Sequence, residues 1–327
     1  MPKLSLLEWV GKQRVDWRIV NEAGLSERQL DCFQLAVMEI LRWKGESNLV
    51  EVFINALDCR VNGLQLRRSE PVLRMGWGVN GKNSFPVKLL ESMISASIIE
   101  NGYCLLHYDA YNIPFSSYYQ THRIKHWSLI VGMGDGEMTL LDLAGNPKWF
   151  NGTVGKVPLD ALRRAWQCST DFGVAVITRM AANDPKAWEN EARRVVRSSI
   201  HSMKVDRGLD HLRIFIDALA SRHASELVPQ LDVLSFDIHY YRKLRELWKT
   251  AADHQIIPEK LRSHALQSLL HRTCKCWSMI MGGLLKWKRQ PQRYSKDHII
   301  GYFEEALKTE TLVIQELAVR EELWAET

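Results

Sequence analysis

Two apolar runs joined by a glycine turn decide the fold of the first half of this chain. They are His126-Trp-Ser-Leu-Ile-Val-Gly132 and Met138-Thr-Leu-Leu-Asp-Leu143, with Gly134-Asp135-Gly136 between them. Short apolar runs on either side of an Asp-Gly pair are typical of a β-hairpin. His126 lies nine residues before Asp135 and Asp142 seven residues after it. In such a hairpin, with strands about 5 Å apart, the two side chains are therefore nearly opposite each other.

Further elements around this hairpin predict an antiparallel sheet with helices packed on it. Residues 103–108 and 172–178 are apolar runs that predict two more strands. Residues 31–43 and 86–99 carry apolar side chains at helical spacing, which predicts two helices. Helices packed on an antiparallel sheet define an α+β domain.

The character of the chain changes near residue 182. Asn183-Asp184-Pro185 is typical of a helix start. Beyond it, apolar residues recur at helical spacing, as between Leu261 and Trp277, with almost no strand signal. We therefore expect two domains, an α+β domain at residues 1–182 and an all-helical domain at residues 183–327.

Composition excludes several classes of protein. The 327 residues are 46% hydrophobic and 25% charged, which is unlike a disordered chain, a collagen-like repeat or a disulfide-stapled miniprotein. The net charge of +5 is too small to indicate nucleic-acid binding. The chain shows neither a secretory signal nor a run of about 18 apolar residues. We expect a cytoplasmic protein that binds no membrane and keeps its six cysteines as free thiols.

Charge is distributed unevenly in the helical half. Between Lys260 and Lys296 there are nine Lys or Arg and no acid, whereas residues 297–327 hold eight acids and two basic residues. One interpretation is a solvated basic helix that faces an acidic one. The other is a docking patch for an acidic partner.

Cys32 follows Asp31 at the expected start of a helix. The N-terminus of a helix stabilises an anion through its dipole and its free N–H groups, so a thiol there can become a thiolate. The alternative is that Cys32 is a small buried apolar residue. His126 and Asp142 favour the first interpretation, because a carboxylate beside an imidazole holds its tautomer and stabilises the imidazolium. A cysteine nucleophile, a histidine base and an orienting aspartate form the constellation of papain-like enzymes.

Four segments give this chain a resemblance to a known family. They are Asp31-Cys32-Phe33-Gln34, the run Tyr108-Asp-Ala-Tyr-Asn-Ile-Pro114, the run from His122 to Gly132, and Leu141-Asp142. In this order they resemble the butirosin biosynthesis protein H family over residues 30–180. The helical remainder resembles it only in layout.

The resemblance implies a papain-type fold and transfer of an acyl group. The acyl group would come from the phosphopantetheine thioester of an acyl or peptidyl carrier protein and pass to a small-molecule amine in antibiotic biosynthesis. Cys32 would be the nucleophile, His126 the base and Asp142 the orienting acid. The enzyme would need no cofactor of its own, and the basic stretch Lys260–Lys296 would suit an acidic carrier.

Other residues are candidates for supporting roles. A papain-type site usually has a glutamine several residues before the cysteine, but this chain has Ser26 there, so Gln29 is the expected oxyanion donor with the Cys32 N–H. The expected substrate contacts are Trp77, Asp109, Tyr111 and His122. For Asp109 and Tyr111, a strand-end cap and a packed ring are equally good interpretations.

Two further motifs are weaker indications of function. Gly76-Trp-Gly-Val-Asn-Gly81 matches GxGxxG, but no βαβ unit surrounds it, and we expect a loop near the site. His271 and Cys274 share a helical face, but Cys276 points elsewhere and a fourth ligand is lacking, so we expect no metal.

The three site residues alone leave the reaction open. An acyl-cysteine attacked by an amine gives an amide, whereas attack by water makes the protein a peptidase or thioesterase. A third hypothesis is an inactive papain-like scaffold used for binding. The lack of a secretion signal, the lack of an attached exporter domain and the basic stretch favour the acyltransferase.

Overall fold

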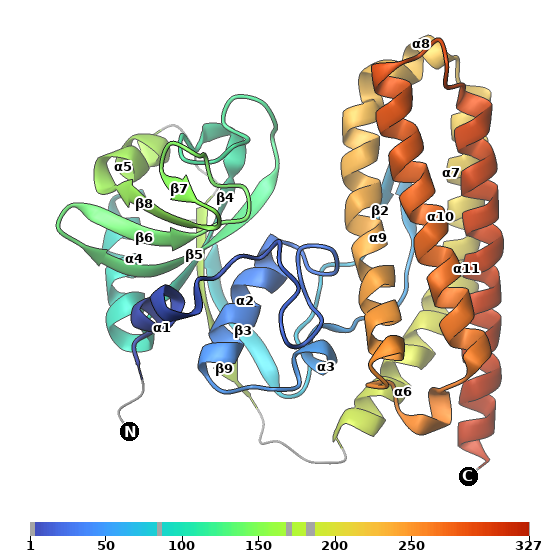
Figure 1. Ribbon diagram of the computed structural model, residues 1–327, viewed down its shortest axis with the longest axis horizontal. Helices are drawn as coiled ribbons and strands as arrows, with labels where there is room; N and C mark the ends of the chain where they lie inside the picture. Colours follow the sequence, from blue (N-terminus) through green and yellow to red (C-terminus); the bar gives the residue numbers. More distant parts are fainter. Residues whose placement is uncertain (1–3, 84–86, 168–171, 181–186, 327) are drawn as a thin grey trace. The chain divides into compact units, whose positions relative to one another are not determined.

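The computed structural model describes residues 4–83, 87–167, 172–180 and 187–326 of the chain. They form two compact units, one of residues 1–49 and 76–182 and the other of residues 50–75 and 183–327 (Figure 1). Among the described residues, no helix combines the length and the apolar character needed to cross a membrane.

The first unit is built on an antiparallel sheet whose strand order within the described residues is β3-β9-β4-β5-β6-β8-β7. Its strands are β3 (Trp77–Asn83), β4 (Cys104–Asp109), β5 (Lys125–Gly134), β6 (Glu137–Leu141), β7 (Phe150–Asn151), β8 (Val154–Pro158) and β9 (Phe172–Arg179). Its helices are α1 (Leu6–Gln13), α2 (Cys32–Trp43), α4 (Val87–Asn101) and α5 (Leu159–Gln167). The expected α+β architecture with an antiparallel sheet is confirmed.

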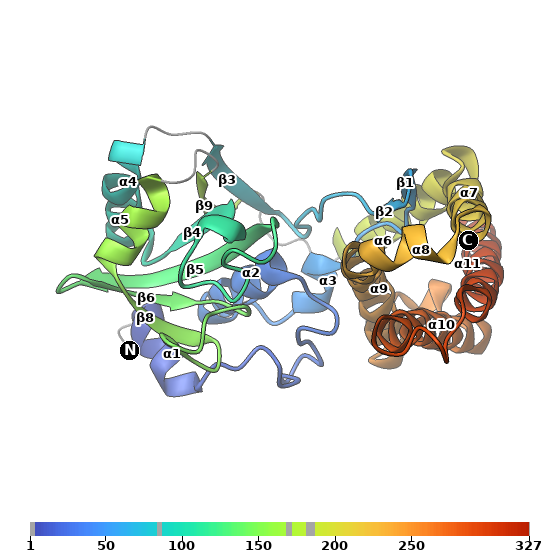
Figure 2. The same ribbon diagram turned by 90° about the horizontal axis from the view of Figure 1, so that it is seen from above.

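Helices cover the sheet on both faces (Figure 2). The side chains of α4 and α5 pack with Leu106 of β4 and Ile130 of β5 in one apolar cluster. On the other face, the ring of Phe33 on α2 lies 5.0 Å from that of Trp127 on β5. Side chains alternate between faces along a strand, so β5 is buried on both sides and forms the centre of the core.

The expected hairpin joins β5 to β6. Gly134 pairs with Glu137, which leaves Asp135 and Gly136 as the two turn residues, with φ of 50° and 76°. Positive φ at both central positions defines the turn whose twist matches that of the strands, and Gly adopts this conformation at no steric cost.

A capping box between Asp31 and Gln34 stabilises the N-terminus of the helix that begins at Cys32. Asp31 accepts a hydrogen bond from the Gln34 N–H at 2.9 Å, and its own N–H donates to Gln34 Oε1 at 3.2 Å. Ten consecutive residues of this helix, from Cys32 to Leu41, are buried. The cap and the apolar sequence together place the N-terminus of α2 inside the first unit.

A buried carboxyl group on α2 predicts that stability depends on pH. Burial raises the pKa of Glu39 to about 7, although Arg42 donates to both of its oxygens at 3.1 and 3.2 Å. Because the folded state binds this proton more tightly than the unfolded state, stability falls as pH rises from about 4.5 to 7. A shift of this size corresponds to roughly 3 kcal/mol.

We therefore expect the free energy of unfolding of Glu39→Gln, measured relative to that of the wild type, to be higher at pH 8 than at pH 5. Denaturant unfolding at the two pH values measures the difference. Glu22→Gln is the matched control, because the Glu22 carboxylate binds the same Arg42 but is largely exposed. An equal effect of Glu39→Gln at both pH values would contradict the assignment.

The second unit is a set of long helices with a short β-ribbon. The helices are α6 (Ala187–Ile200), α7 (Gly208–Ser221), α8 (Ala224–Leu227), α9 (Leu231–Asp253), α10 (His264–Arg289) and α11 (Lys296–Ala325). The ribbon of β1 (Arg60–Asn62) and β2 (Gln65–Arg67) lies beside α7 and α9 (Figure 2). The expected helical character of the C-terminal part is confirmed.

The division of the chain differs from the expected one. The boundary near residue 182 and the Asn183-Asp184-Pro185 motif lie outside the described residues. The segment Val50–Met75, which we expected in the first domain, belongs to the second unit and enters it through the short helix α3 (Leu49–Phe53). Its Leu57 N–H donates to Ser199 Oγ and its Asn55 carbonyl accepts from the Trp248 indole, both at 2.9 Å. These hydrogen bonds connect residues far apart in the sequence, which local patterns do not reveal.

Candidate active site

The structure brings Cys32, His126 and Asp142 together in the first unit. His126 Nε2 lies 2.7 Å from Asp142 Oδ1. Since Nε2 faces the carboxylate, Nδ1 is the ring nitrogen left for Cys32, which lies close enough to His126 to raise the pKa of the imidazole. All three side chains are buried. The arrangement has the order of a thiol, an imidazole and an orienting carboxylate.

A β-bulge sets the face on which Asp142 lies. Near the turn Gly132 pairs with Thr139, but beyond the irregularity Ile130 pairs with Leu140 and Leu129 with Leu141, so Val131 is an extra residue. Continuing this register puts Asp142 opposite Ser128. Ser128 lies two positions after His126 on β5, so the side chains of Asp142, Ser128 and His126 are on the same face of the sheet. A regular hairpin would put Asp142 opposite Leu129, whose side chain points to the other face.

Four donors surround the Asp142 carboxylate. Oδ1 accepts from His126 and from the Ala144 N–H at 2.7 Å. Oδ2 accepts from the Tyr108 hydroxyl at 2.7 Å and from the Ser128 hydroxyl. Burial raises the pKa of Asp142, but the charge of His126 and the hydrogen bonds from His126, Ser128 and Tyr108 outweigh burial and hold the pKa below its ordinary value. The carboxylate therefore stays ionised without contact with solvent.

The charge state of His126 follows from its two neighbours. Burial lowers the pKa of His126, but the charges of Asp142 and Cys32 and the hydrogen bonds to both raise it well above 6.5. An imidazolium beside a thiol is the pair of groups that cysteine-dependent acyl transfer uses. A thiolate at a helix N-terminus can attack a carbonyl carbon, and the imidazolium can protonate the leaving group.

Three residues of the site were missed in the sequence. Tyr108 pairs with His126 across β4 and β5, and its ring lies 5.6 Å from the imidazole. Ser128 is a polar residue two positions after His126 in an apolar strand, and this period of two is a signal that could have found it. Tyr118 lies in the loop before β5, with its ring 6.0 Å from that of His126.

The expected oxyanion donor lies in the turn that precedes α2. Gln29 Oε1 accepts from the Ser26 N–H at 3.0 Å, and Gln29 Nε2 donates to the Gly24 carbonyl at 3.3 Å. These bonds hold the side chain within the turn. The role of Gln29 as an oxyanion donor stays a prediction.

Asp109, Tyr111 and His122 lie close to the strand end that carries His126. Asp109 pairs with Lys125 and caps the following turn through the Tyr111 N–H at 3.1 Å. The Arg123 guanidinium lies 4.6 Å from the Tyr111 ring. His122 is exposed, and the Tyr118 ring contacts both it and His126. The capping interpretation of Asp109 is confirmed, and the substrate contacts stay predictions.

Trp77 does not lie at this site. Phe172 of β9 pairs with Tyr108, the partner of His126, whereas Trp77 pairs with Arg179 at the other end of β9. Seven residues of strand separate the two ends, which corresponds to about 23 Å. The residues expected to form a loop from Gly76 to Gly81 instead belong largely to strand β3. The expectation that Trp77 contacts the substrate is wrong, because the register of β9 carries it away from His126 and Cys32.

Cys59, Cys104, Cys274 and Cys276 are buried free thiols, and Cys168 lies outside the described residues. His271 bonds to Asp253 Oδ1 at 2.7 Å. Within the described part of the chain, no three His, Cys, Asp or Glu side chains gather closely enough to hold a metal ion.

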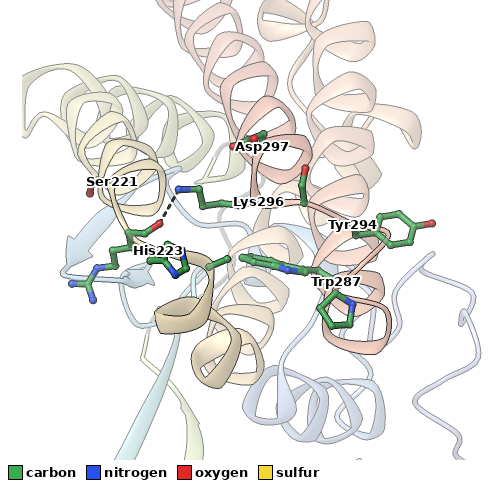
Figure 3. A pocket seen from close by; sticks show the side chains of 10 residues that line it. Ser221, His223, Trp287, Tyr294, Lys296 and Asp297 are labelled. Carbon is green, nitrogen blue, oxygen red and sulfur yellow. Dashed lines mark hydrogen bonds between the residues drawn. The ribbon is translucent and has the colours of Figure 1, made fainter.

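A pocket of about 490 Å³ lies in the second unit, at the end of the helices near α8 (Figure 3). His223, Trp287, Tyr294 and Lys296 are among the residues that line it. Lys296 Nζ donates to the carbonyls of Ala220 and Arg222 at 2.6 and 2.8 Å, so its charge is directed to the C-terminus of α7. This use of the lysine is structural.

The basic stretch Lys260–Lys296 covers α10 and the loop that follows. Arg272 pairs with Glu305 on α11, and Lys288 pairs with Asp232 on α9 at 2.5 Å. The interpretation of a basic helix beside an acidic one therefore accounts for part of the stretch. Among the described residues, Lys275, Lys286, Arg289 and Arg293 form no ion pair.

Two comparisons with known proteins identify no relative of this chain. No protein-family model matches the chain, and a search of curated proteins finds no match either. The inferences below therefore depend on the geometry of the site and on the motifs of the sequence.

Proposed function

We propose that the protein is a cysteine-dependent acyltransferase with a papain-like first unit, related to the butirosin biosynthesis protein H family. The observation that carries the proposal is the buried series from Cys32 through His126 to Asp142. A buried carboxylate with four donors and an imidazole beside a helix-N-terminal thiol is costly to maintain for packing alone. It is the arrangement that acyl transfer through an acyl-cysteine requires.

The reaction would proceed in two balanced steps. The Cys32 thiolate attacks the carbonyl carbon of a thioester, a new C–S bond forms, and the donor thiol leaves with a proton from His126. An amine then attacks the acyl-Cys32, His126 accepts the amine proton, and the C–S bond breaks as the amide forms. The protein needs no cofactor for either step.

The donor and the acceptor follow from the resemblance and from charge. We infer that the donor is an acyl or peptidyl carrier protein that carries the acyl group on phosphopantetheine. Lys275, Lys286, Arg289 and Arg293 are the positive charges available to attract such an acidic partner. The acceptor would be a small-molecule amine of a natural-product pathway in the cytoplasm.

Mass spectrometry of the intact protein tests the first step. We expect incubation with an acyl thioester to add the mass of one acyl group, and we expect peptide mapping to place it on Cys32. Cys32→Ala should remain unmodified, whereas Cys276→Ala, which removes a buried thiol of the second unit, should be acylated like the wild type. Acylation of Cys32→Ala at the wild-type rate would exclude Cys32 as the nucleophile.

The second step distinguishes transfer from hydrolysis. Addition of an amine to the acylated protein should give an amide and restore the free thiol. Release of the free acid at the same rate with and without amines would instead show a thioesterase or peptidase. A protein that forms no adduct, with Cys32 alkylated no faster than an ordinary thiol, would be a binding scaffold.

A further inference from the structure

The oxyanion of an acyl-transfer reaction needs two donors, and the backbone supplies one of them. Cys32 is the first residue of α2, so its N–H has no partner within the helix. A second donor must reach the same oxygen from a side chain or another N–H. Gln29 is held by Ser26 and Gly24, and Gln34 is held in the capping box with Asp31. The Gln29 side chain therefore stabilises the turn before α2, and the Gln34 side chain stabilises the N-terminal cap of α2.

The ring of Tyr118 is fixed beside His126. Its centroid lies 6.0 Å from that of His126, nearly perpendicular at 73°, and 6.0 Å from that of His122. The Tyr118 N–H donates to Ser116 Oγ at 3.1 Å, and the ring packs against the apolar cluster beneath the sheet. Contacts on several sides hold the ring in one orientation.

The hydroxyl of Tyr118 differs from that of Tyr108, the other tyrosine beside His126. The Tyr108 hydroxyl bonds to Asp142, whereas the Tyr118 hydroxyl has no hydrogen-bond partner in the part of the chain that the structure describes. Burial and then the charges of Cys32, Asp142 and Glu27 raise the pKa of Tyr118. The phenol therefore stays protonated near the thiol and is available as a donor.

We propose that the Tyr118 hydroxyl, together with the Cys32 N–H, donates a hydrogen bond to the oxyanion that forms when Cys32 attacks a carbonyl carbon. The inference rests on the proposed acyl chemistry and assigns the donor that the glutamine of a papain-type site would otherwise supply. The oxygen gains a full negative charge in the tetrahedral intermediate, and a neutral phenol beside it stabilises that charge more than it stabilises the substrate carbonyl.

Two reagents separate this role from a role in activating the thiol. p-Nitrophenyl acetate reacts through an oxyanion: the thiolate adds to the carbonyl, the C–O bond breaks, and nitrophenolate leaves with the electron pair. Iodoacetamide reacts by displacement of iodide at a saturated carbon and forms no oxyanion. We expect Tyr118→Phe to slow acetylation of Cys32 by about 100-fold and to leave the alkylation rate and its pH profile unchanged.

Two variants serve as comparisons. Tyr119→Phe removes the neighbouring hydroxyl, which is exposed and accepts from Gln120 Nε2, and should behave as the wild type in both reactions. Gln29→Ala tests the alternative donor, and selective slowing of acetylation by this variant but not by Tyr118→Phe would overturn the inference.

The remaining outcomes are also decisive. Equal slowing of both reactions in Tyr118→Phe would mean that Tyr118 acts on the Cys32–His126 pair, and no slowing of either would mean that it does not act at all. A wild-type protein that is alkylated rapidly but acylated by neither the ester nor a thioester would overturn the proposed function and this inference with it.

Discussion

Asp142→Asn is expected to slow alkylation of Cys32 by iodoacetamide on the order of 1000-fold near pH 7. An opposite charge within about 4–6 Å shifts a pKa by one to three units, and burial of both His126 and Asp142 favours the upper end. Without the carboxylate the imidazolium loses its stabilisation, so the thiolate–imidazolium pair gives way to a neutral thiol and imidazole. The rate of alkylation reports the thiolate, so the rate should fall with it.

The asparagine should fit the site with little change in shape. Its carbonyl oxygen can accept from His126 and from the Ala144 N–H, as Oδ1 does now. Its amide can donate to Tyr108 and Ser128, because their hydroxyls can rotate to accept. The Nε2–H tautomer of His126 is thereby kept, so the loss of rate measures the loss of charge.

Asp135→Asn provides the control for this prediction. Asp135 lies in the turn of the same hairpin, and asparagine tolerates its positive φ. This variant should be alkylated at the wild-type rate. A wild-type rate in Asp142→Asn as well would show that the carboxylate does not stabilise the thiolate.

The sequence predicted the parts of the site that depend on local signals. The Asp-Gly turn predicted the hairpin, and Asp31 before an apolar helical pattern predicted the start of α2, so Cys32, His126 and Asp142 could be named in advance. Each of these signals lies within a few residues of the element that it specifies.

The parts that depend on register could not be predicted in the same way. Val131 carries no mark of a bulge, yet it decides that Asp142 faces His126 and not the opposite side of the sheet. Trp77 was expected near Cys32 because its glycine-rich surroundings were interpreted as a loop. Its place was set by pairing with Arg179, a contact across about a hundred residues.

The assignment of Val50–Met75 to the second unit also could not be predicted, because it depends on contacts between residues distant in the sequence. Its partners, Ser199, Arg245 and Trp248, lie far along the chain and become neighbours only when the helices have assembled. Local periodicity describes which face of an element is apolar, but it does not name the element that covers that face.

Arg245→Ala is expected to destabilise the second unit by about 3–5 kcal/mol. Arg245 and Glu310 are fully buried, with Nε and Oε1 2.8 Å apart. Glu310 also accepts from the Trp277 indole at 2.8 Å. Removal of the guanidinium leaves a carboxylate in the core without its cation, and the cost of that charge dominates the effect.

Two comparison variants separate this cost from the loss of any ion pair. Arg272→Ala removes a partly exposed pair with Glu305 on the neighbouring helix and should cost at most about 1 kcal/mol. Replacement of both Arg245 and Glu310 by methionine removes both buried charges and should cost less than Arg245→Ala alone. Denaturant unfolding measures all three, and equal losses in Arg245→Ala and Arg272→Ala would refute the argument.

Arg245→Ala should also loosen the segment Val50–Met75, because Arg245 Nη2 donates to the Asp58 carbonyl at 3.3 Å. The Leu57 and Leu66 amides donate to Ser199 Oγ on α6 and to Asp237 Oδ2 on α9, so both report whether this segment stays in place. Hydrogen exchange of these amides should accelerate in Arg245→Ala and remain slow in Arg272→Ala. If the unit is destabilised while the two amides stay protected, Arg245 stabilises the helices but does not hold the segment. Acceleration of both shows that the buried ion pair also fastens the segment that this unit takes from the first half of the chain.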